Sequence, residues 1–237
     1  MNVLKNALKK ISYVLFPKRC ELCGQIIEID DSVCEDCKNP PLIKPPLCTH
    51  CGAAKDDCIC KKHKNEYKKI VAPYYYKDSI VTAIHRFKNS DMTFLAERFS
   101  KDICKYIEEN CSDITFDFVT FVPLRYLKEK RRGYNQSEIL AKRIADYFDL
   151  EVVACLKKVR YTGVQHKKSA SKRRADIFGA YDVDKKYIGN VEGKTILLID
   201  DVKTTGSTLN ECAKMLKIYG ADLVCCASVA VTNRRKK

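Results

Sequence analysis

No part of this sequence is apolar for long enough to cross a membrane. The 237 residues have a mean hydropathy of −0.31, and charged residues interrupt the apolar stretches before they reach transmembrane length. The first twenty residues also lack the features of a signal peptide. Lys5, Lys9 and Lys10 break their apolar positions, and no small-residue cleavage site follows. We interpret this segment as an amphipathic helix and expect a protein that is not secreted.

Acidic residues are too few to balance the basic ones. The chain has 44 Lys or Arg against 30 Asp or Glu, for a formal charge of +14. Residues 125 to 174 alone hold fifteen basic and five acidic side chains, and the chain ends in RRKK. A positive region of this kind attracts phosphate, either in nucleic acid or in a phosphorylated small molecule. The alternative is a solvated basic face that serves only solubility.

Cysteine, in contrast, is abundant and clustered. Eight of the fourteen cysteines lie within forty-one residues: Cys20, Cys23, Cys34, Cys37, Cys48, Cys51, Cys58 and Cys60. They form three CxxC pairs and one CxC pair. CxxC pairs separated by a short loop are typical of closed, structural Zn²⁺ sites. The other six cysteines stand among apolar neighbours and are expected to be ordinary buried thiols.

Two alternatives remain open for the clustered cysteines. A disulfide scaffold requires an oxidising compartment, which the missing export features do not favour. The sequence does not decide which pairs share a metal, because CxxC pairs can interleave, and His50 or His63 could replace a cysteine. The segment is short and rich in Lys, Asp and Pro, so we expect bound zinc to supply folding energy that its small core lacks.

Composition changes near residue 66, where we place a domain boundary. A proline-rich joint (39–48) separates the two cysteine groups, and a charged bridge (61–69) follows them. We therefore predict a small zinc-ribbon-like domain over residues 1–66 and a second domain over residues 67–237.

The second domain alternates predicted strands and helices. Apolar runs indicate strands, and spacings of three and four residues indicate amphipathic helices. The predicted strands are 70–76, 116–123, 194–200 and 222–231, and the predicted helices are 78–88, 92–110, 136–150 and 207–220. This alternation predicts an α/β fold with a parallel sheet flanked by helices.

Two adjacent acids end the apolar strand 194–200. Asp200 and Asp201 should lie at the carboxyl end of that strand, where ligands of such sheets bind. A loop of small residues follows and leads into a helix N-terminus, which offers free amides to a phosphate. Its hydroxyl residues and glycine are Thr204, Thr205, Gly206, Ser207 and Thr208. Carboxylates suit sugar hydroxyls, so a ribose 5-phosphate satisfies both features.

This loop is not a Walker phosphate loop, because the Gly-Lys-Ser/Thr ending is absent. An alternative is a simple strand-to-helix turn that uses aspartate as a turn former. Two adjacent acids followed by TTGST favour a ligand site over that alternative.

The segment IDDVKTTGST resembles the phosphoribosyl pyrophosphate (PRPP) motif of type I phosphoribosyltransferases. Three further segments precede this motif in the chain. They are, in order, the cysteine pairs, VPLRYLKEKRRGYNQS at 122–137 and TGVQHKKSASKRRADIFGAY at 162–181. This order is similar to that of the ComF family of bacterial competence proteins, over about residues 15–232. Lys203 and Asp176 depart from the family's usual apolar or aromatic residue and asparagine, respectively.

The resemblance implies a type I phosphoribosyltransferase-like fold and roles for particular residues. Asp200 and Asp201 would contact the ribose, and residues 204–208 would hold the 5′-phosphate. Pro123 and Leu124 lie in the segment that resembles the pyrophosphate loop. The candidate cations for the departing pyrophosphate are Arg125, Lys130, Arg131 and Arg132, with Lys88 as a further candidate from another strand end. Mg²⁺ bound mainly by substrate oxygens fits that chemistry.

These features allow more than one function. The first is Mg²⁺- and PRPP-dependent transfer of phosphoribosyl to an unknown acceptor. The second is single-stranded DNA binding by the zinc region and the basic stretch, and the third is a PRPP-sensing regulator without turnover. The ComF resemblance implies a role in DNA uptake during natural transformation, a cytoplasmic location, and partners among competence or DNA-processing proteins.

Overall fold

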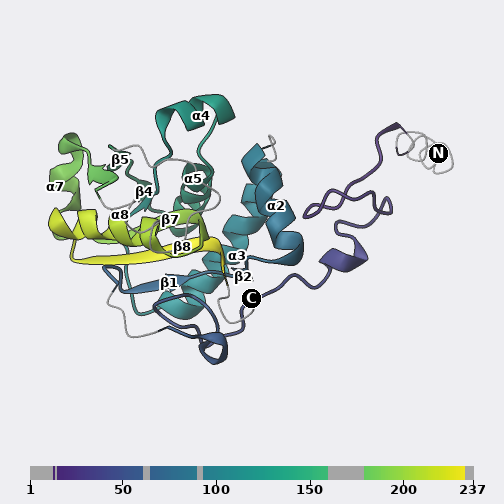
Figure 1. Cartoon of the computed structure of the whole chain (residues 1–237), viewed down its shortest axis with the longest axis horizontal. Helices are drawn as coiled ribbons and strands as arrows, with labels where there is room; N and C mark the ends of the chain where they lie inside the picture. The colour runs from purple at the N-terminus through teal and green to yellow at the C-terminus, as the bar shows by residue number, and fades with distance from the viewer. Residues whose placement is uncertain (1–12, 14, 61–64, 90–92, 160–178, 233–237) are drawn as a thin grey trace.

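The computed structural model describes residues 13, 15–60, 65–89, 93–159 and 179–232. Its main sheet is parallel, with strand order β1-β8-β7-β3-β4 and with β2 also paired to β8 (Figure 1). The described strands are β1 (Lys69–Val71), β2 (Tyr74–Tyr75), β3 (Phe118–Phe121), β4 (Glu151–Val152), β5 (Leu156–Lys158), β6 (Tyr181–Val183), β7 (Thr195–Lys203) and β8 (Leu223–Val231). The described helices are α2 (Asp78–Asn89), α3 (Thr93–Cys111), α4 (Tyr126–Arg132), α5 (Gln136–Phe148), α7 (Ile188–Val191) and α8 (Ser207–Ile218), with short 3₁₀ turns η1 (Glu35–Cys37), η2 (Lys55–Asp57) and η3 (Lys185–Tyr187).

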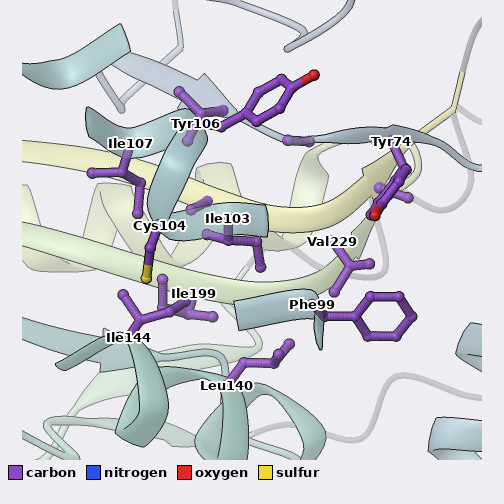
Figure 2. Packing of buried hydrophobic residues seen from close by; sticks show 14 of the residues in the cluster. Tyr74, Phe99, Ile103, Cys104, Tyr106, Ile107, Leu140, Ile144, Ile199 and Val229 are labelled. Atoms are coloured by element: carbon purple, nitrogen blue, oxygen red, sulfur yellow. The ribbon is translucent and has the colours of Figure 1, made fainter. Parts of the chain in front are cut away.

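The sheet separates two hydrophobic cores. Successive residues of β7 point to opposite faces, so Leu197 and Ile199 join one core while Ile196 and Leu198 join the other. The first core contains α2, α3 and α5, and Figure 2 shows side chains from α3, α5 and the strands gathered there. The second core contains α8 and the antiparallel pair of β5 and β6. Because helices cover both faces, β7 has the continuous apolar run Ile196–Ile199 that the sequence predicted.

Two predicted strands differ from the structure in extent. The strand expected at 70–76 is split into β1 and β2 at Pro73, whose nitrogen has no hydrogen to donate to a neighbouring strand. The carbonyl of Pro73 instead accepts a hydrogen bond from Ile43. The strand expected at 194–200 continues to Lys203, because β8 remains its partner as far as the pair Lys203 and Val231. The other predicted strands and helices are confirmed within a few residues.

The proline-rich joint lies along the edge of the sheet. Leu42 forms an antiparallel bridge with Tyr74, and the Tyr75 amide donates to the Pro41 carbonyl. Cysteine-region residues such as Leu22 belong to the same hydrophobic cluster as Tyr74. The boundary near residue 66 stays a prediction, and the two segments that it separates are packed against each other.

Several predicted features lie outside the described residues. They include most of the N-terminal amphipathic helix, His63, the basic residues between 160 and 174, Asp176 and the RRKK tail. None of the helices in the described ranges has both the length and the apolar character needed to cross a membrane.

Candidate functional site

The two acids stand where β7 has lost one of its neighbouring strands. Strand β3 pairs with β7 only as far as Ile199, whereas β8 continues beside it. Asp200 and Asp201 therefore follow the last residue that is paired on both sides. The sequence placed them at the strand end, and the structure places them inside β7 but beyond the end of β3. Their carboxylates are thus held by regular backbone on one side and are free of a strand on the other.

The two carboxylates have different surroundings. Asp201 forms an ion pair with Lys88 of α2, with 2.8 Å between Oδ2 and Nζ. Asp200 accepts hydrogen bonds at Oδ1 from the Ser137 hydroxyl (3.1 Å) and the Asp201 amide (2.9 Å). Burial, followed by the charge of Asp201, raises the pKa of Asp200 to about 7. Lys88 therefore neutralises the charge of Asp201, whereas Asp200 changes between its protonated and ionised forms near neutral pH.

The start of α5 fixes the position of Ser137. Asn135 is the N-cap of this helix: its side chain accepts from the Ser137 amide (3.0 Å) and donates to the Val122 carbonyl at the end of β3 (3.1 Å). The neighbouring Tyr134 hydroxyl donates to the Phe87 carbonyl of α2 (2.6 Å). The YNQS segment thus ties α5, β3 and α2 to the acid pair.

The loop after β7 has the geometry of a phosphate-binding turn. Gly206 is the N-cap of α8 with φ +80°, a conformation that favours glycine. A Cβ atom there would lie 2.9 Å from Lys203 Cε, so the loop folds closely over that buried side chain. Thr205 and Ser207 share a hydroxyl hydrogen bond of 2.8 Å, and the Thr204 carbonyl accepts from Thr232. The Ser207 amide donates to the Thr205 hydroxyl at 3.3 Å, and the amides that follow it in the first turn of α8 suit an anion.

The candidate cations are distributed along α4. Arg125 is the N-cap of this helix and is exposed, as are Lys130 and Arg131 in its last turn. Pro123 and Leu124, between β3 and α4, are half-buried. The sequence predicted no helix here, and α4 ends at Gly133 in the left-handed conformation (φ 85°).

Arg132 is the arginine of α4 that faces inward. It is half-buried and donates to Gln136 Oε1. Burial lowers the pKa of Arg132, and the charge of Asp201 opposes that change. Among the described residues, Gln136 Nε2 is buried without a hydrogen-bond acceptor. The structure thus brings Arg132 into the field of the acid pair and leaves Arg125 and Arg131 at the surface.

The eight clustered cysteines form two separate groups in sequence order. One group is Cys20, Cys23, Cys34 and Cys37, and the other is Cys48, Cys51, Cys58 and Cys60. Within each group the sulfur atoms all lie within 4.8 Å of one another. Two tetrahedral four-cysteine sites therefore fit the structure, and interleaved pairing does not. His50 belongs to neither group, and its carbonyl accepts hydrogen bonds from Asn65 and Tyr67.

The thiols of the first group differ in how readily they ionise. Burial raises the pKa of Cys20, but hydrogen bonds from the Cys23 and Cys34 amides outweigh it and bring the pKa to about 6. Burial and the neighbouring thiols raise the pKa of Cys37 well above its ordinary value. Four thiolates cannot coexist at this distance without positive charge between them, and Zn²⁺ supplies that charge. The cysteine clusters thus support structural zinc.

Sequence reasoning missed Ser137 and Asn135, and it gave Lys88 less weight than the arginines. The Asn-x-Ser spacing before an amphipathic helix is an N-cap pattern that could have identified the first two. No local pattern indicates that Lys88, more than a hundred residues before the acids, would contact Asp201.

Two family models match this chain. A phosphoribosyl transferase domain matches residues 134–237, and a double zinc ribbon domain matches residues 11–69. Together they place the acid pair and the two cysteine groups in separate known domains.

Curated relatives match across both regions. Competence protein F of Haemophilus influenzae is 28% identical, with 87% of this chain and 94% of that protein aligned. Competence protein ComFC of Bacillus subtilis is 25% identical, covering 90% of this chain and 75% of the relative. Among solved structures, glutamine PRPP amidotransferase from B. subtilis aligns over 71% of this chain and 32% of its own, with 18% identity and a TM-score of 0.42.

Proposed function

Because this chain is a ComF-like protein with a phosphoribosyltransferase-fold domain and an N-terminal zinc ribbon, we propose that it binds PRPP with Mg²⁺ at the carboxyl edge of its parallel sheet. One observation carries the proposal: Asp200 and Asp201 lie in β7 just beyond the end of β3, two residues before a glycine-containing loop that opens α8. The first feature suits ribose hydroxyls, and the second suits a phosphate.

In this proposal the acids bind the ribose as hydrogen-bond acceptors. The Ser137 hydroxyl holds Asp200 in place, so its second oxygen can accept from a sugar hydroxyl. Ligand binding favours the ionised carboxylate of Asp200, and its pKa near 7 means that this form is available at neutral pH. The ribose hydroxyls then replace the water molecules around the carboxylates of Asp200 and Asp201. These two charges do not stabilise the fold, so a role in ligand binding accounts for them.

The 5′-phosphate binds the loop between β7 and α8. The amides at the start of α8 and the hydroxyls of Thr205 and Ser207 donate to its oxygens, and Thr204 and Thr208 complete the loop. Gly206 permits close approach because no side chain stands between the backbone and the phosphate. Lys203, buried below the loop, adds positive charge to the same region.

The pyrophosphate group lies toward α4. Pro123 and Leu124 border it, and Arg125, Arg131 and Arg132 are the proposed catalytic cations. Of these three arginines, we expect Arg132 to interact most strongly with the site, because the charge of Asp201 acts on its pKa. Arg125 and Arg131 are exposed on α4 and would have to turn toward the ligand.

The proposed reaction is transfer of the phosphoribosyl group. The bond between the anomeric carbon and a pyrophosphate oxygen breaks, the bonding electrons leave with pyrophosphate, and a nucleophilic acceptor forms the new bond through an oxocarbenium-like state. Mg²⁺, when bound with PRPP, would offset the charge of the leaving group. The arginines stabilise the developing negative charge, and the acids orient the ribose.

The relatives support a role for this chain in DNA uptake and competence. Their printed names are Competence protein F, Competence protein ComFC and, in Escherichia coli K12, DNA utilization protein YhgH, which is 26% identical over 86% of both chains. We propose that the protein acts in the cytoplasm with other competence or DNA-processing proteins, and that PRPP binding belongs to that role.

Calorimetric titration of PRPP with Mg²⁺ at near-physiological salt tests the site. The wild type should bind, and Asp200→Asn with Asp201→Asn should weaken binding by about 100-fold or more, because hydrogen bonds to two charged groups are lost. Asp222→Asn, an exposed acid before β8 at the opposite edge of the sheet, is the matched control. A folded, zinc-loaded wild type that does not bind contradicts the proposal. Pyrophosphate release then separates an enzyme from a PRPP-sensing regulator.

A second candidate function is single-stranded DNA binding, which the surface of α4 favours. Tyr126 and Leu127 are 73% and 59% exposed, next to the exposed cations of the same helix. Aromatic and basic side chains together bind unpaired bases and their phosphates. Tyr126→Ala should weaken oligonucleotide binding, whereas the Asp200 and Asp201 double variant should leave it unchanged. The reverse result excludes α4 as the DNA surface.

A further inference from the structure

We propose that Arg86 is a positioning residue that joins the first cysteine cluster (Cys20, Cys23, Cys34 and Cys37) to the ligand site, and that its target, Lys88, binds the pyrophosphate group of PRPP. This inference rests on the proposed function. It assigns the zinc region a part in ligand binding, in addition to its part in folding.

Arg86 contacts the backbone carbonyl groups of the turn that begins the first cysteine cluster. Its Nη1 atom lies 3.0, 2.9 and 3.0 Å from the carbonyl oxygens of Cys20, Glu21 and Leu22. The guanidinium also fills the space beside Gly24, where a Cβ atom would meet Arg86 Cζ at 3.1 Å. Three carbonyl oxygens can converge on one nitrogen only if the turn between Cys20 and Cys23 is fixed, and a metal bound by those two thiolates fixes it.

The same helix turn of α2 reaches the acid pair. Lys88 lies two residues after Arg86 and forms the 2.8 Å ion pair with Asp201. Between them, the Phe87 carbonyl accepts from the Tyr134 hydroxyl at 2.6 Å, and the Phe87 ring is fully buried. The last turn of α2 is therefore fixed at three consecutive residues: to the cysteine cluster, to the YNQS segment and to Asp201. A shift of the cluster would move Lys88 with it.

Charge and exposure indicate what Lys88 does when a ligand arrives. The side chains of Lys88 and Asp201 are 26% and 17% exposed, so the pair borders solvent and a ligand can reach it. Ribose hydroxyls would take over the carboxylate of Asp201 as donors. The ammonium of Lys88 then has to find a new acceptor nearby, and the pyrophosphate group is the strongest one that PRPP offers. Lys88 thus exchanges a carboxylate for a phosphate oxygen.

The second cysteine cluster (Cys48, Cys51, Cys58 and Cys60) has different contacts. The Thr49 carbonyl accepts from Ile70 of β1, and the Tyr75 hydroxyl donates to Asp57 at 2.6 Å. These contacts hold the edge of the sheet, and α2 is not involved in them. Glu21, in the turn between Cys20 and Cys23, forms an ion pair with Arg98 of α3 at 3.2 Å. Arg98 therefore provides a matched control, because it stabilises the same turn from a helix that does not carry Lys88.

A double-mutant cycle tests the relay in the full-length, zinc-loaded protein. Arg86→Met and Lys88→Met keep an unbranched apolar side chain at each position and remove its charge. Each should weaken Mg²⁺-PRPP binding about tenfold by calorimetry, and the two together should weaken it no more than Lys88→Met alone. Arg98→Met should stay within about threefold of the wild type. Unchanged affinity in Arg86→Met, or multiplication of the two effects to about 100-fold, overturns the proposal.

Amide hydrogen exchange supplies a readout that does not depend on the ligand. In Arg86→Met, and after mild chelation of zinc, exchange should become faster in residues 84–89 and 134–137, while the β7 amides stay protected. Arg98→Met should not produce this pattern. If exchange at 84–89 is unchanged, the relay is wrong whether or not the wild type binds PRPP. If exchange changes but the wild type does not bind PRPP, the assignment of Lys88 is wrong together with the proposed function.

Discussion

The acid edge of the sheet and the two cysteine clusters serve stability in opposite ways. Asp200 and Asp201 place two like charges side by side in partly buried surroundings, and the raised pKa of Asp200 records the cost. The cysteine clusters gather groups that a single metal ion can hold together in a segment with few apolar residues. The first region weakens the fold in favour of a ligand, and the second compensates for a small core.

The two regions are nevertheless connected. Arg86 donates into the first cysteine cluster, and Lys88, two residues later, neutralises Asp201. The first cysteine cluster, which stabilises the fold, thus orients Lys88 at the acid edge, which destabilises it. Loss of a clustered cysteine should therefore lower stability, whereas removal of the Asp200 charge should raise it. Within the cysteine region, only substitutions that disturb the contact with α2 should change ligand affinity as well.

The largest expected effect on stability is the loss of one zinc ligand. Cys37 is 1% exposed in the first cluster, and Cys37→Ser should lower the free energy of unfolding by more than about 4 kcal/mol and release one zinc ion per chain. Denaturant unfolding with metal analysis measures both. The control is Cys104→Ser, since Cys104 is an equally buried thiol of α3 outside the clusters. Equal losses in the two variants would mean that Cys37 is only a core thiol.

The acid edge should show the opposite sign. The pKa of Asp200 is raised from 3.8 to about 7 in the folded chain, so the folded chain binds the proton more tightly than the unfolded chain does. Wild-type stability should fall as pH rises from about 4 to 7. Asp200→Asn keeps the acceptor for Ser137 and removes the charge, so it should be more stable by about 1 to 3 kcal/mol above pH 7.

Unfolding curves of Asp200→Asn and the wild type at pH 4.5 and pH 8 measure this difference. The gain should be much smaller at the lower pH, because Asp200 is protonated in the folded wild type there and that pH lies close to the unfolded pKa of 3.8. A gain of the same size at both pH values would show that the carboxylate charge is not the cause.

Ser137→Ala should have the smallest effect of the three. It removes the hydroxyl donor of Asp200, which should raise the pKa of that acid further and lower stability by about 1 kcal/mol. PRPP affinity at pH 7 should fall a few-fold and recover at pH 8.5, where Asp200 is ionised again. Ser137→Thr keeps the hydroxyl and is the control. A loss of affinity that is independent of pH would assign Ser137 directly to the ligand.

Much of the fold could be predicted because its elements are local. The apolar run before Asp200 and the periodic spacing in α3 and α5 indicate strands and helices from neighbouring residues alone. The strand expected at 70–76 was too long because Pro73 interrupts it. Helix α4 was missed because its sequence is charged on every side, and Gly133 alone marked its end.

The site could be predicted only where its residues are adjacent in sequence. The acids and the following loop form one motif, whereas Lys88 and Ser137 reach the acids from two separate helices. The grouping of cysteines was equally undecided, since spacing allows interleaved and sequential pairs. It is the path of the chain after Cys37, along the edge of the sheet, that separates the two clusters.

The most direct test of the central claim is the thermal unfolding midpoint at pH 8, with and without Mg²⁺-PRPP, of the wild type and of the Asp200→Asn, Asp201→Asn double variant. Without ligand, the double variant should unfold at a higher temperature than the wild type. A saturating ligand should raise the midpoint of the wild type by several degrees, because it binds only the folded chain, and should leave the variant unchanged. An equal rise in both proteins, or none in the wild type, would contradict the assignment of this edge to PRPP.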